Sequence, residues 1–265
     1  MAKRFIFTIT AGRTGTAWLA SFLHENLQFP VIHEYLGVDD FGVKMPDIRV
    51  MRVFNERGLD KIVQAFWQTK FSSICDLDNY GETNHTLAKC GLIETLAAID
   101  LDRDIYIFNI KRNWVDQCIS YLVRADFRNM TSVWQWYLAS SYARKILDPA
   151  PYHKASPRFG EIFWYIAEME ARQAYYKALY GDRFNFIDCD LESLVTLDGA
   201  ADVLGRLGVS NMPPRLPPKE NDNKMTANAQ LRQELQDAVD GIAFDATHMA
   251  NEYIHAGHRL ASWKS

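Results

Sequence analysis

The sequence predicts an α/β fold in three layers, in which helices flank a central parallel sheet of about five strands. Short apolar runs alternate with segments whose apolar residues recur at helical spacing. This alternation is typical of a parallel sheet, because parallel neighbours are joined by long crossover connections that usually contain a helix. The chain has 265 residues, 48% of them hydrophobic, which is enough for one sizeable core. We therefore expect a single domain over residues 1–265.

The N-terminal half is expected to supply most of the sheet. Apolar runs bounded by polar or turn residues predict four strands there, at residues 5–9, 31–32, 72–76 and 105–110. Apolar residues at helical spacing predict four helices that connect and follow these strands, at residues 15–27, 56–70, 86–99 and 114–125.

The C-terminal half is expected to be mainly helical. The same spacing predicts four helices, at residues 131–147, 161–180, 199–207 and 226–255. The third of these should end at Gly208, because glycine adopts the left-handed conformation that often follows a helix. The run 184–188 predicts a further strand, and the Pro-rich stretch 213–218 predicts a loop.

Charge and cysteine content narrow the class of protein. A formal net charge of −4 offers no basic surface for nucleic acid, so none is expected as a partner. The four cysteines lack C-x-x-C spacing, which predicts reduced thiols and no metal site. The sequence shows neither a signal-peptide pattern nor an apolar stretch of membrane length. These features predict a cytoplasmic protein that does not bind a membrane.

The most informative segment is residues 10–19, Thr-Ala-Gly-Arg-Thr-Gly-Thr-Ala-Trp-Leu, which directly follows the apolar run 5–9. A strand, a glycine-bearing turn and a helix start form an arrangement that binds phosphate on backbone N–H groups. The segment is not an ATP-binding Walker A loop, because only two residues separate Gly12 from Gly15 and Thr16 follows where a lysine is needed. The sequence therefore predicts an anion-binding loop of another kind.

A second strand carries a matching motif about a hundred residues later. The apolar run 105–110 leads to Arg112, and Ser120 follows eight residues further on, within the predicted helix 114–125. A guanidinium offers a planar fork to phosphate oxygens, and a serine hydroxyl adds another donor near a helix N-terminus. Taken alone, this pair is more often a surface arginine and a helix serine. Two loops that each follow an apolar run, about a hundred residues apart, are much harder to explain by chance.

Residues 13–19 resemble the 5′-phosphosulfate loop of the sulfotransferases, and Arg112 with Ser120 resembles that family's 3′-phosphate site. The resemblance covers roughly residues 4–210. It implies a P-loop-like fold and an enzyme that takes a sulfuryl group from 3′-phosphoadenosine 5′-phosphosulfate (PAPS), releasing adenosine 3′,5′-bisphosphate (PAP). The cofactor-binding residues that it implies are Gly12, Arg13, Thr14, Gly15, Thr16, Ala17, Trp18, Arg112, Ser120, Lys219 and Lys224. Trp18 fits equally a position near adenine and one in the core.

Sulfuryl transfer requires a cation at the bridging oxygen and a base at the acceptor. Arg13 is the expected cation. The resemblance gives two placements for the base, after the first helix and before the Arg112 strand, and this chain has candidates at both. We expect Glu34 first and His85 second, with His33 and Glu82 as neighbours that form hydrogen bonds or orient the acceptor.

Three positions depart from the family pattern. Leu191-Glu192 stands where the family usually has a tyrosine-glutamate pair, and Thr83 replaces a lysine. The C-terminal arginine-lysine-glycine triplet is missing, so Lys219 or Lys224 would have to contact the 3′-phosphate. Two other functions stay open: a small-molecule kinase that uses ATP, and an inactive nucleotide-binding protein.

The acceptor is expected to be a small molecule with a hydroxyl or an amine, handled by a monomer or a homodimer. Aromatic walls with a few polar groups usually line such a pocket. We expect most of the middle aromatic residues in the core and some at the acceptor: Trp134, Trp136, Tyr137, Phe163, Trp164 and Tyr165.

Overall fold

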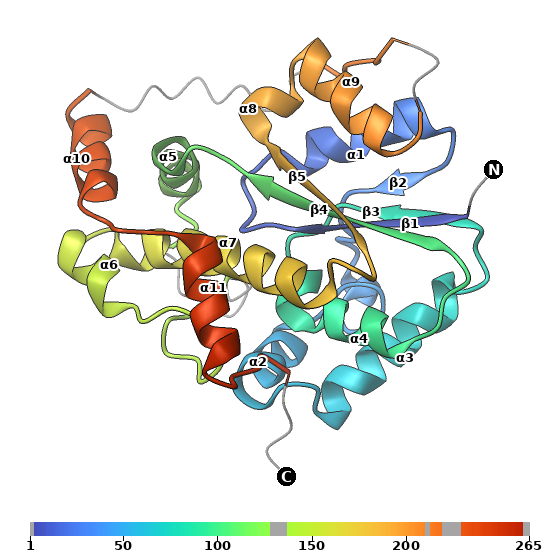
Figure 1. The fold of residues 1–265 in the computed structure, drawn as a ribbon, viewed down its shortest axis with the longest axis horizontal. Coiled ribbons are helices and arrows are strands. Elements are labelled where there is room, and N and C mark those ends of the chain that lie inside the picture. The colour runs from blue at the N-terminus through green and yellow to red at the C-terminus, as the bar shows by residue number, and fades with distance from the viewer. Residues whose placement is uncertain (1–2, 128–136, 210–212, 219–228, 262–265) are drawn as a thin grey trace.

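The computed structural model describes residues 3–127, 137–209, 213–218 and 229–261, and a parallel five-stranded sheet lies at its centre (Figure 1). The order is β2-β3-β1-β4-β5, and every neighbouring pair is parallel. The strands are β1 (Arg4–Ile9), β2 (Val31–Ile32), β3 (Asn79–Glu82), β4 (Asp104–Lys111) and β5 (Asn185–Asp190). The predicted α/β fold with about five parallel strands is thereby confirmed.

Strand β1 lies between β3 and β4, and this order decides where the loops meet. Phe7 pairs with Glu82 on one side, and Ile9 pairs with Asn109 on the other. Because all strands are parallel, the segments that follow β1, β3 and β4 leave the same edge of the sheet. Three segments therefore meet at this edge: the loop at residues 10–15, the segment around His85, and Arg112 at the end of β4.

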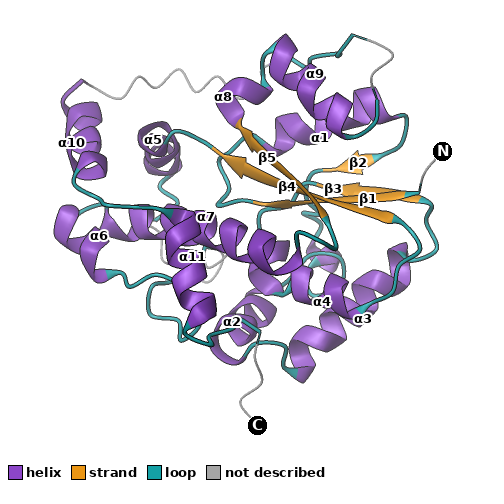
Figure 2. Cartoon of the chain, viewed as in Figure 1, coloured by secondary structure: helices purple, strands orange, loops and turns teal. Residues whose placement is uncertain are grey.

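Helices cover both faces of the sheet (Figure 2). One face carries α1 (Thr16–Leu27), α8 (Leu191–Leu194) and α9 (Leu197–Arg206), and the other carries α3 (Lys61–Ile74), α4 (Leu92–Ala98) and α7 (Gly160–Tyr180). The alternation along β1 explains this layering: Ile6 packs in the cluster with α1 and α9, whereas Phe5, Phe7 and Ile9 pack in the cluster with α3 and α7.

The remaining helices surround this core, and α11 packs along α7. They are α2 (Ile48–Arg57), α5 (Trp114–Arg124), α6 (Ala150–Ala155), α10 (Ala229–Asp240) and α11 (Ala246–His255), with short 3-10 turns η1 (Val38–Asp40) and η2 (Leu87–Cys90). Within the described residues, no helix is both long enough and apolar enough to cross a bilayer.

Two predictions between residues 56 and 76 are wrong. The expected helix 56–70 is the end of α2 and most of α3, which Gly58 separates with a φ of 79°. The expected strand 72–76 is the last turn of α3 and the turn after it, because Phe71 and Ile74 continue the buried stripe of that helix. The strand of this region is β3 instead, whose buried Tyr80 pairs with Phe5 of β1.

Three predicted helices are also shorter or broken. Gly91, with a φ of 86°, divides the predicted helix 86–99 into η2 and α4. The predicted helix 226–255 is α10 and α11 over its described part, and Asp245 caps the second by accepting from His248 N. Of the predicted helix 131–147, residues 131–136 lie outside the described part and 137–147 are not helical.

Candidate active site

The loop between β1 and α1 has a conformation that explains its glycines. Gly12, Arg13 and Gly15 have positive φ values of 86°, 58° and 79°. A Cβ atom on Gly12 would stand 3.2 Å from the ring of His85, and one on Gly15 would overlap Cδ1 of Leu191. Glycine is needed at both positions for backbone conformation and for close approach.

Side chains from other elements hold the carbonyl groups of this loop. Gln117 Nε2 donates to Gly12 O at 2.7 Å, and the Tyr121 hydroxyl donates to Ala11 O at 2.8 Å and to Gly12 O at 2.9 Å. The Tyr165 hydroxyl, on α7, also donates to Ala11 O, at 2.5 Å. The carbonyl groups are thus turned toward α5 and α7.

The N–H groups of the same loop remain open to a ligand. Those of residues 13–17 donate to no acceptor within the described part of the chain. The hydroxyls of Thr10 and Thr14 form a hydrogen bond with each other, which fixes the inner side of the turn. Free N–H groups at the start of a twelve-residue helix are able to bind an anion.

The second motif reaches this loop, as Arg112 at the end of β4 and Ser120 on α5. Arg112 Nη1 donates to Arg13 O at 2.9 Å. Arg13 Nε donates to Ser120 Oγ at 2.9 Å, so the side chain of Arg13 lies across the space between the two loops. The structure therefore brings together Arg13, Arg112 and Ser120, three of the side chains to which the sequence gives roles in binding or transfer.

Arg13 lies in a partly enclosed and charged setting. Burial lowers its pKa, and the nearby Arg124 lowers it further. Asp126 opposes this effect, and its Oδ1 lies 3.7 Å from Nε of Arg124. Two guanidinium groups with one carboxylate leave a net positive charge beside the loop, which favours binding of an anionic ligand.

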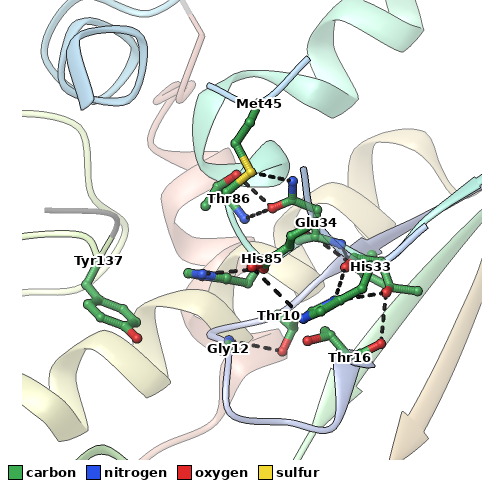
Figure 3. Close-up of polar contacts among 12 residues, drawn as sticks. Thr10, Gly12, Thr16, His33, Glu34, Met45, His85, Thr86 and Tyr137 are labelled. Carbon is green, nitrogen blue, oxygen red and sulfur yellow. Dashed lines mark hydrogen bonds and ion pairs between the residues drawn. The ribbon is translucent and has the colours of Figure 1, made fainter. Parts of the chain in front are cut away.

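The base candidates Glu34, His33 and His85 lie together beside the loop (Figure 3). Glu34 Oε1 is 3.7 Å from His85 Nε2, and Oε2 is 4.0 Å from His33 Nε2. His33 Nδ1 contacts Thr83 O at 2.8 Å, and the Thr83 hydroxyl donates to Thr16 O at 2.8 Å. Burial raises the pKa of Glu34 and is the largest influence on it.

A buried lysine approaches His85 from the other side. Lys89 Nζ lies 2.9 Å from His85 Nδ1 and donates to the Tyr165 hydroxyl at 2.8 Å. Burial lowers the pKa of Lys89 to about 7. Burial, and then the charge of Lys89, hold the pKa of His85 well below its ordinary value. His85 is therefore a neutral imidazole at neutral pH.

Glu82 has hydrogen-bond partners that differ from those of the other base candidates. Its side chain is fully buried, with Lys70 Nζ 2.6 Å from Oε2 and Asn84 Nδ2 2.9 Å from Oε1. The Tyr80 hydroxyl donates to the same carboxylate. These three donors make Glu82 an anchor for the end of β3, which positions the following Thr83.

The other predicted binding residues divide into three groups. Ala17 is partly exposed in the first turn of α1. Trp18 is 7% exposed, stacks on Phe22, and donates from Nε1 to Pro217 O at 3.1 Å, so its ring belongs to the core beneath α1. Lys219 and Lys224 lie outside the described residues.

The sequence reasoning missed Gln117, Tyr121 and Lys89, and it named Tyr165 only among the aromatic residues of the core or the acceptor pocket. Gln117 and Tyr121 lie one helical turn apart on α5, on the same side as Ser120, so spacing relative to Ser120 could have identified them. Tyr165 and Lys89 are brought to the loop by tertiary packing alone, and no local pattern marks them. Leu191, where the family pattern has tyrosine, packs against Gly15.

Comparisons with known proteins give a structural likeness only. No family model matches the chain, and no curated protein matches it. A sulfotransferase from Alicyclobacillus acidocaldarius is similar in structure at 17% sequence identity, covering 100% of both chains with a TM-score of 0.49. The case for a function therefore depends on the residues of the site.

Proposed function

We propose that this protein is a sulfotransferase that moves a sulfuryl group from PAPS to a small-molecule acceptor. The observation that carries the proposal is the meeting of Arg13, Arg112 and Ser120 from two separate strand–loop–helix units. One unit offers open backbone N–H groups, and the other offers a guanidinium and a hydroxyl. A donor with a phosphosulfate at one end and a separate 3′-phosphate fits this pair of sites.

The hydrogen-bond donors of the two loops match the charged groups of PAPS. Open N–H groups at the start of α1 would hold the 5′-phosphosulfate, with Thr14 and Thr16 beside them. Arg112 and Ser120 would hold the 3′-phosphate by charge-assisted hydrogen bonds. Gly15 allows the positive φ of the loop and the close approach of Leu191, which together keep the backbone in this conformation.

PAPS supplies an activated sulfuryl group. The residues of the chain would supply a cation that stabilises the leaving group and a base that accepts the proton of the acceptor. Arg13 would stabilise the negative charge that develops on the bridging oxygen as the sulfuryl group leaves. Its guanidinium can reach that oxygen with one nitrogen while another stays near Ser120. Glu34 or His85 would accept the proton of the acceptor.

The affinity for PAP compared with that for ADP tests the proposal. Each charge-assisted hydrogen bond contributes about 1.5–3 kcal/mol, so wild-type protein should bind PAP at least tenfold more tightly than ADP. Isothermal titration of Arg112→Ala should show similar affinities for the two ligands. Arg49→Ala is the matched control, since Arg49 is 70% exposed on α2, and it should keep the preference.

Other outcomes point to the other two functions. Equal affinity for PAP and ADP in wild-type protein, with magnesium-dependent turnover of ATP, would contradict the proposal and indicate a kinase. Tight PAP binding without sulfation of any acceptor in a broad panel would indicate an inactive nucleotide-binding protein.

A further inference from the structure

A cavity of about 700 Å³ opens beside the candidate active site, between α2, α5, α7 and residues 137–142. Its walls are mainly apolar, and Phe127, Leu138, Phe159 and Ile162 form much of them. The volume is in the range of pockets that enclose a small organic molecule. Among the described residues, these four side chains take no part in the contacts proposed above for PAPS.

Two aromatic residues belong to both the cavity and the candidate active site. Tyr121 lines the cavity, and its hydroxyl donates to the carbonyl groups of Ala11 and Gly12 in the anion loop. Tyr137 also lines the cavity, and its ring stacks on that of His85 with centroids 5.7 Å apart (Figure 3). A molecule in the cavity would therefore lie against the walls of the site where transfer is proposed.

One buried carboxylate gives the cavity a polar end. Asp126 is 3% exposed and lines the cavity, and its Oδ2 accepts from the Tyr137 hydroxyl at 3.3 Å. Its Oδ1 accepts no hydrogen bond from any described residue, and Nε of Arg124 lies 3.7 Å away. A hydrogen-bond donor on a ligand would satisfy this oxygen.

The charges around Asp126 favour a neutral donor. The guanidinium groups of Arg124 and Arg13 already interact with its carboxylate. A third cation would be repelled by these two, whereas a hydroxyl adds no charge. Of the other ionic residues of the lining, Arg158 pairs with Glu234, and Glu161 accepts a hydrogen bond from Ser140. The others lie exposed on α2.

We infer that this cavity is the acceptor site and that the acceptor is a neutral alcohol or phenol with an apolar, ring-sized body. The inference rests on the proposed function. In the reaction, the hydroxyl oxygen forms a bond to sulfur while the bond from sulfur to the bridging oxygen breaks. That electron pair stays on the phosphate of PAP. The hydroxyl donates to Asp126 in the resting complex and turns to Glu34 or His85, which takes its proton, when the bond to sulfur forms.

The lining also excludes two other classes of acceptor. A sugar would place several of its hydroxyl groups against Phe127, Leu138, Phe159 and Ile162, which offer them no hydrogen-bond partners. A protonated amine would meet the two guanidinium groups beside Asp126. The cavity should therefore discriminate by the charge and by the number of polar groups on the acceptor.

The test uses acceptors that share one body. Naphthalenemethanol and naphthalenemethylamine differ only in the hydroxyl or ammonium group, and glucose is the polyhydroxyl probe. Product formation is measured by mass spectrometry, and direct binding by isothermal titration. Ala139→Trp fills the cavity at a lining position, and Ala201→Trp places the same side chain on the exposed face of α9.

We expect sulfation of naphthalenemethanol, at least tenfold faster at low substrate concentration than that of the amine or of glucose. Ala139→Trp should raise KM for the alcohol at least tenfold with PAP affinity unchanged, and Ala201→Trp should change neither. If Ala139→Trp does not fold, Ser141→Trp, at an exposed lining position, replaces it with the same expectation.

Equal turnover of the three probes, or an unchanged KM in a folded cavity-filling variant, would overturn the inference. The proposed function fails separately, by the lack of PAP preference over ADP. In that case titration with the alcohol still tests whether the cavity binds an apolar alcohol. Binding that is lost in Ala139→Trp and kept in Ala201→Trp would support this site, and an absence of binding would refute it.

Discussion

Lys89 Nζ lies 2.9 Å from Nδ1 of His85, and the lysine side chain is fully enclosed by protein. A charged lysine ammonium can donate hydrogen bonds but cannot accept them. It therefore donates to Nδ1, and the proton of the neutral ring is on Nε2. Nε2 is the nitrogen that faces Glu34. The protonation state of Lys89 therefore decides whether His85 can accept a proton toward the active site.

We predict that the sulfation rate rises with a midpoint near pH 7 if His85 is the base. Burial lowers the pKa of Lys89 to about 7, so above that pH the amine is neutral and can accept a proton from Nδ1. Nε2 is then free to act. Lys89→Met should remove this rise, as measured by initial rates from about pH 6 to 9, while PAP binding reports intact folding. A rise that persists in the variant would assign the titration to another group.

Arg13→Met should leave the protein folded and remove most of its turnover. Loss of one group that stabilises transition-state charge reduces kcat by a factor of about 10²–10³. Arg49→Met, at an exposed position on α2, is the control and should keep wild-type turnover. Near-normal kcat in Arg13→Met would show that another cation acts, with Lys111 the next residue to replace.

Glu34→Gln distinguishes the two base candidates. The amide keeps the shape of the side chain and cannot accept a proton, so sulfation should fall by about a hundredfold or more if Glu34 is the base. His85→Ala should then have the smaller effect. Glu25→Gln, on the exposed side of α1, is the matched control. The reverse order of effects would identify His85 as the base.

Gly15→Ala should destabilise the protein more than Gly208→Ala. Both glycines have a positive φ, 79° and 73°, so both variants carry backbone strain of about 1–2 kcal/mol. A Cβ on Gly15 overlaps Leu191, whereas one on Gly208 has no atom of a described residue within 4 Å other than those of its two chain neighbours. Leu191→Ala should partly rescue Gly15→Ala in urea unfolding. Equal losses of stability would show that Leu191 moves aside freely.

Lys70→Met should cost about 3–5 kcal/mol of unfolding free energy, because it leaves the carboxylate of Glu82 buried without its cation. Lys44→Met removes a lysine whose side chain is 48% exposed, and it should cost far less unfolding free energy than Lys70→Met. Thermal unfolding of the two variants gives the comparison. Equal, small effects would indicate that Tyr80 and Asn84 alone hold Glu82 in place.

The sequence was sufficient to predict the two strand–loop–helix units that carry the candidate site residues. The loop at residues 10–15 follows an apolar strand and begins a helix, and Arg112 with Ser120 repeats this arrangement. Such units are recognisable because the strand, the turn and the start of the helix are adjacent in the sequence. The parallel sheet followed from the alternation of apolar runs with helical segments.

Other parts depend on tertiary contacts that no local pattern reveals. Strand β3 contains a single large apolar residue, Tyr80, and its place is fixed by pairing with β1. The segment 137–147 contains aromatic and aliphatic residues at helical spacing, yet Glu168 binds the N–H groups of Ile146 and Leu147 in a non-helical conformation. The approach of Lys89 to His85 likewise appears only in the folded chain.

The hydrogen bonds from Gln117, Tyr121 and Tyr165 to the loop carbonyls have a consequence for ligand affinity. The entropy of ordering the loop is lost when the protein folds rather than when the ligand arrives, because these donors already fix the backbone. Preorganisation of this kind strengthens binding without any additional contact to the ligand. Tyr121→Phe removes a hydroxyl that donates to the carbonyl groups of Ala11 and Gly12, so it should weaken PAP binding in isothermal titration.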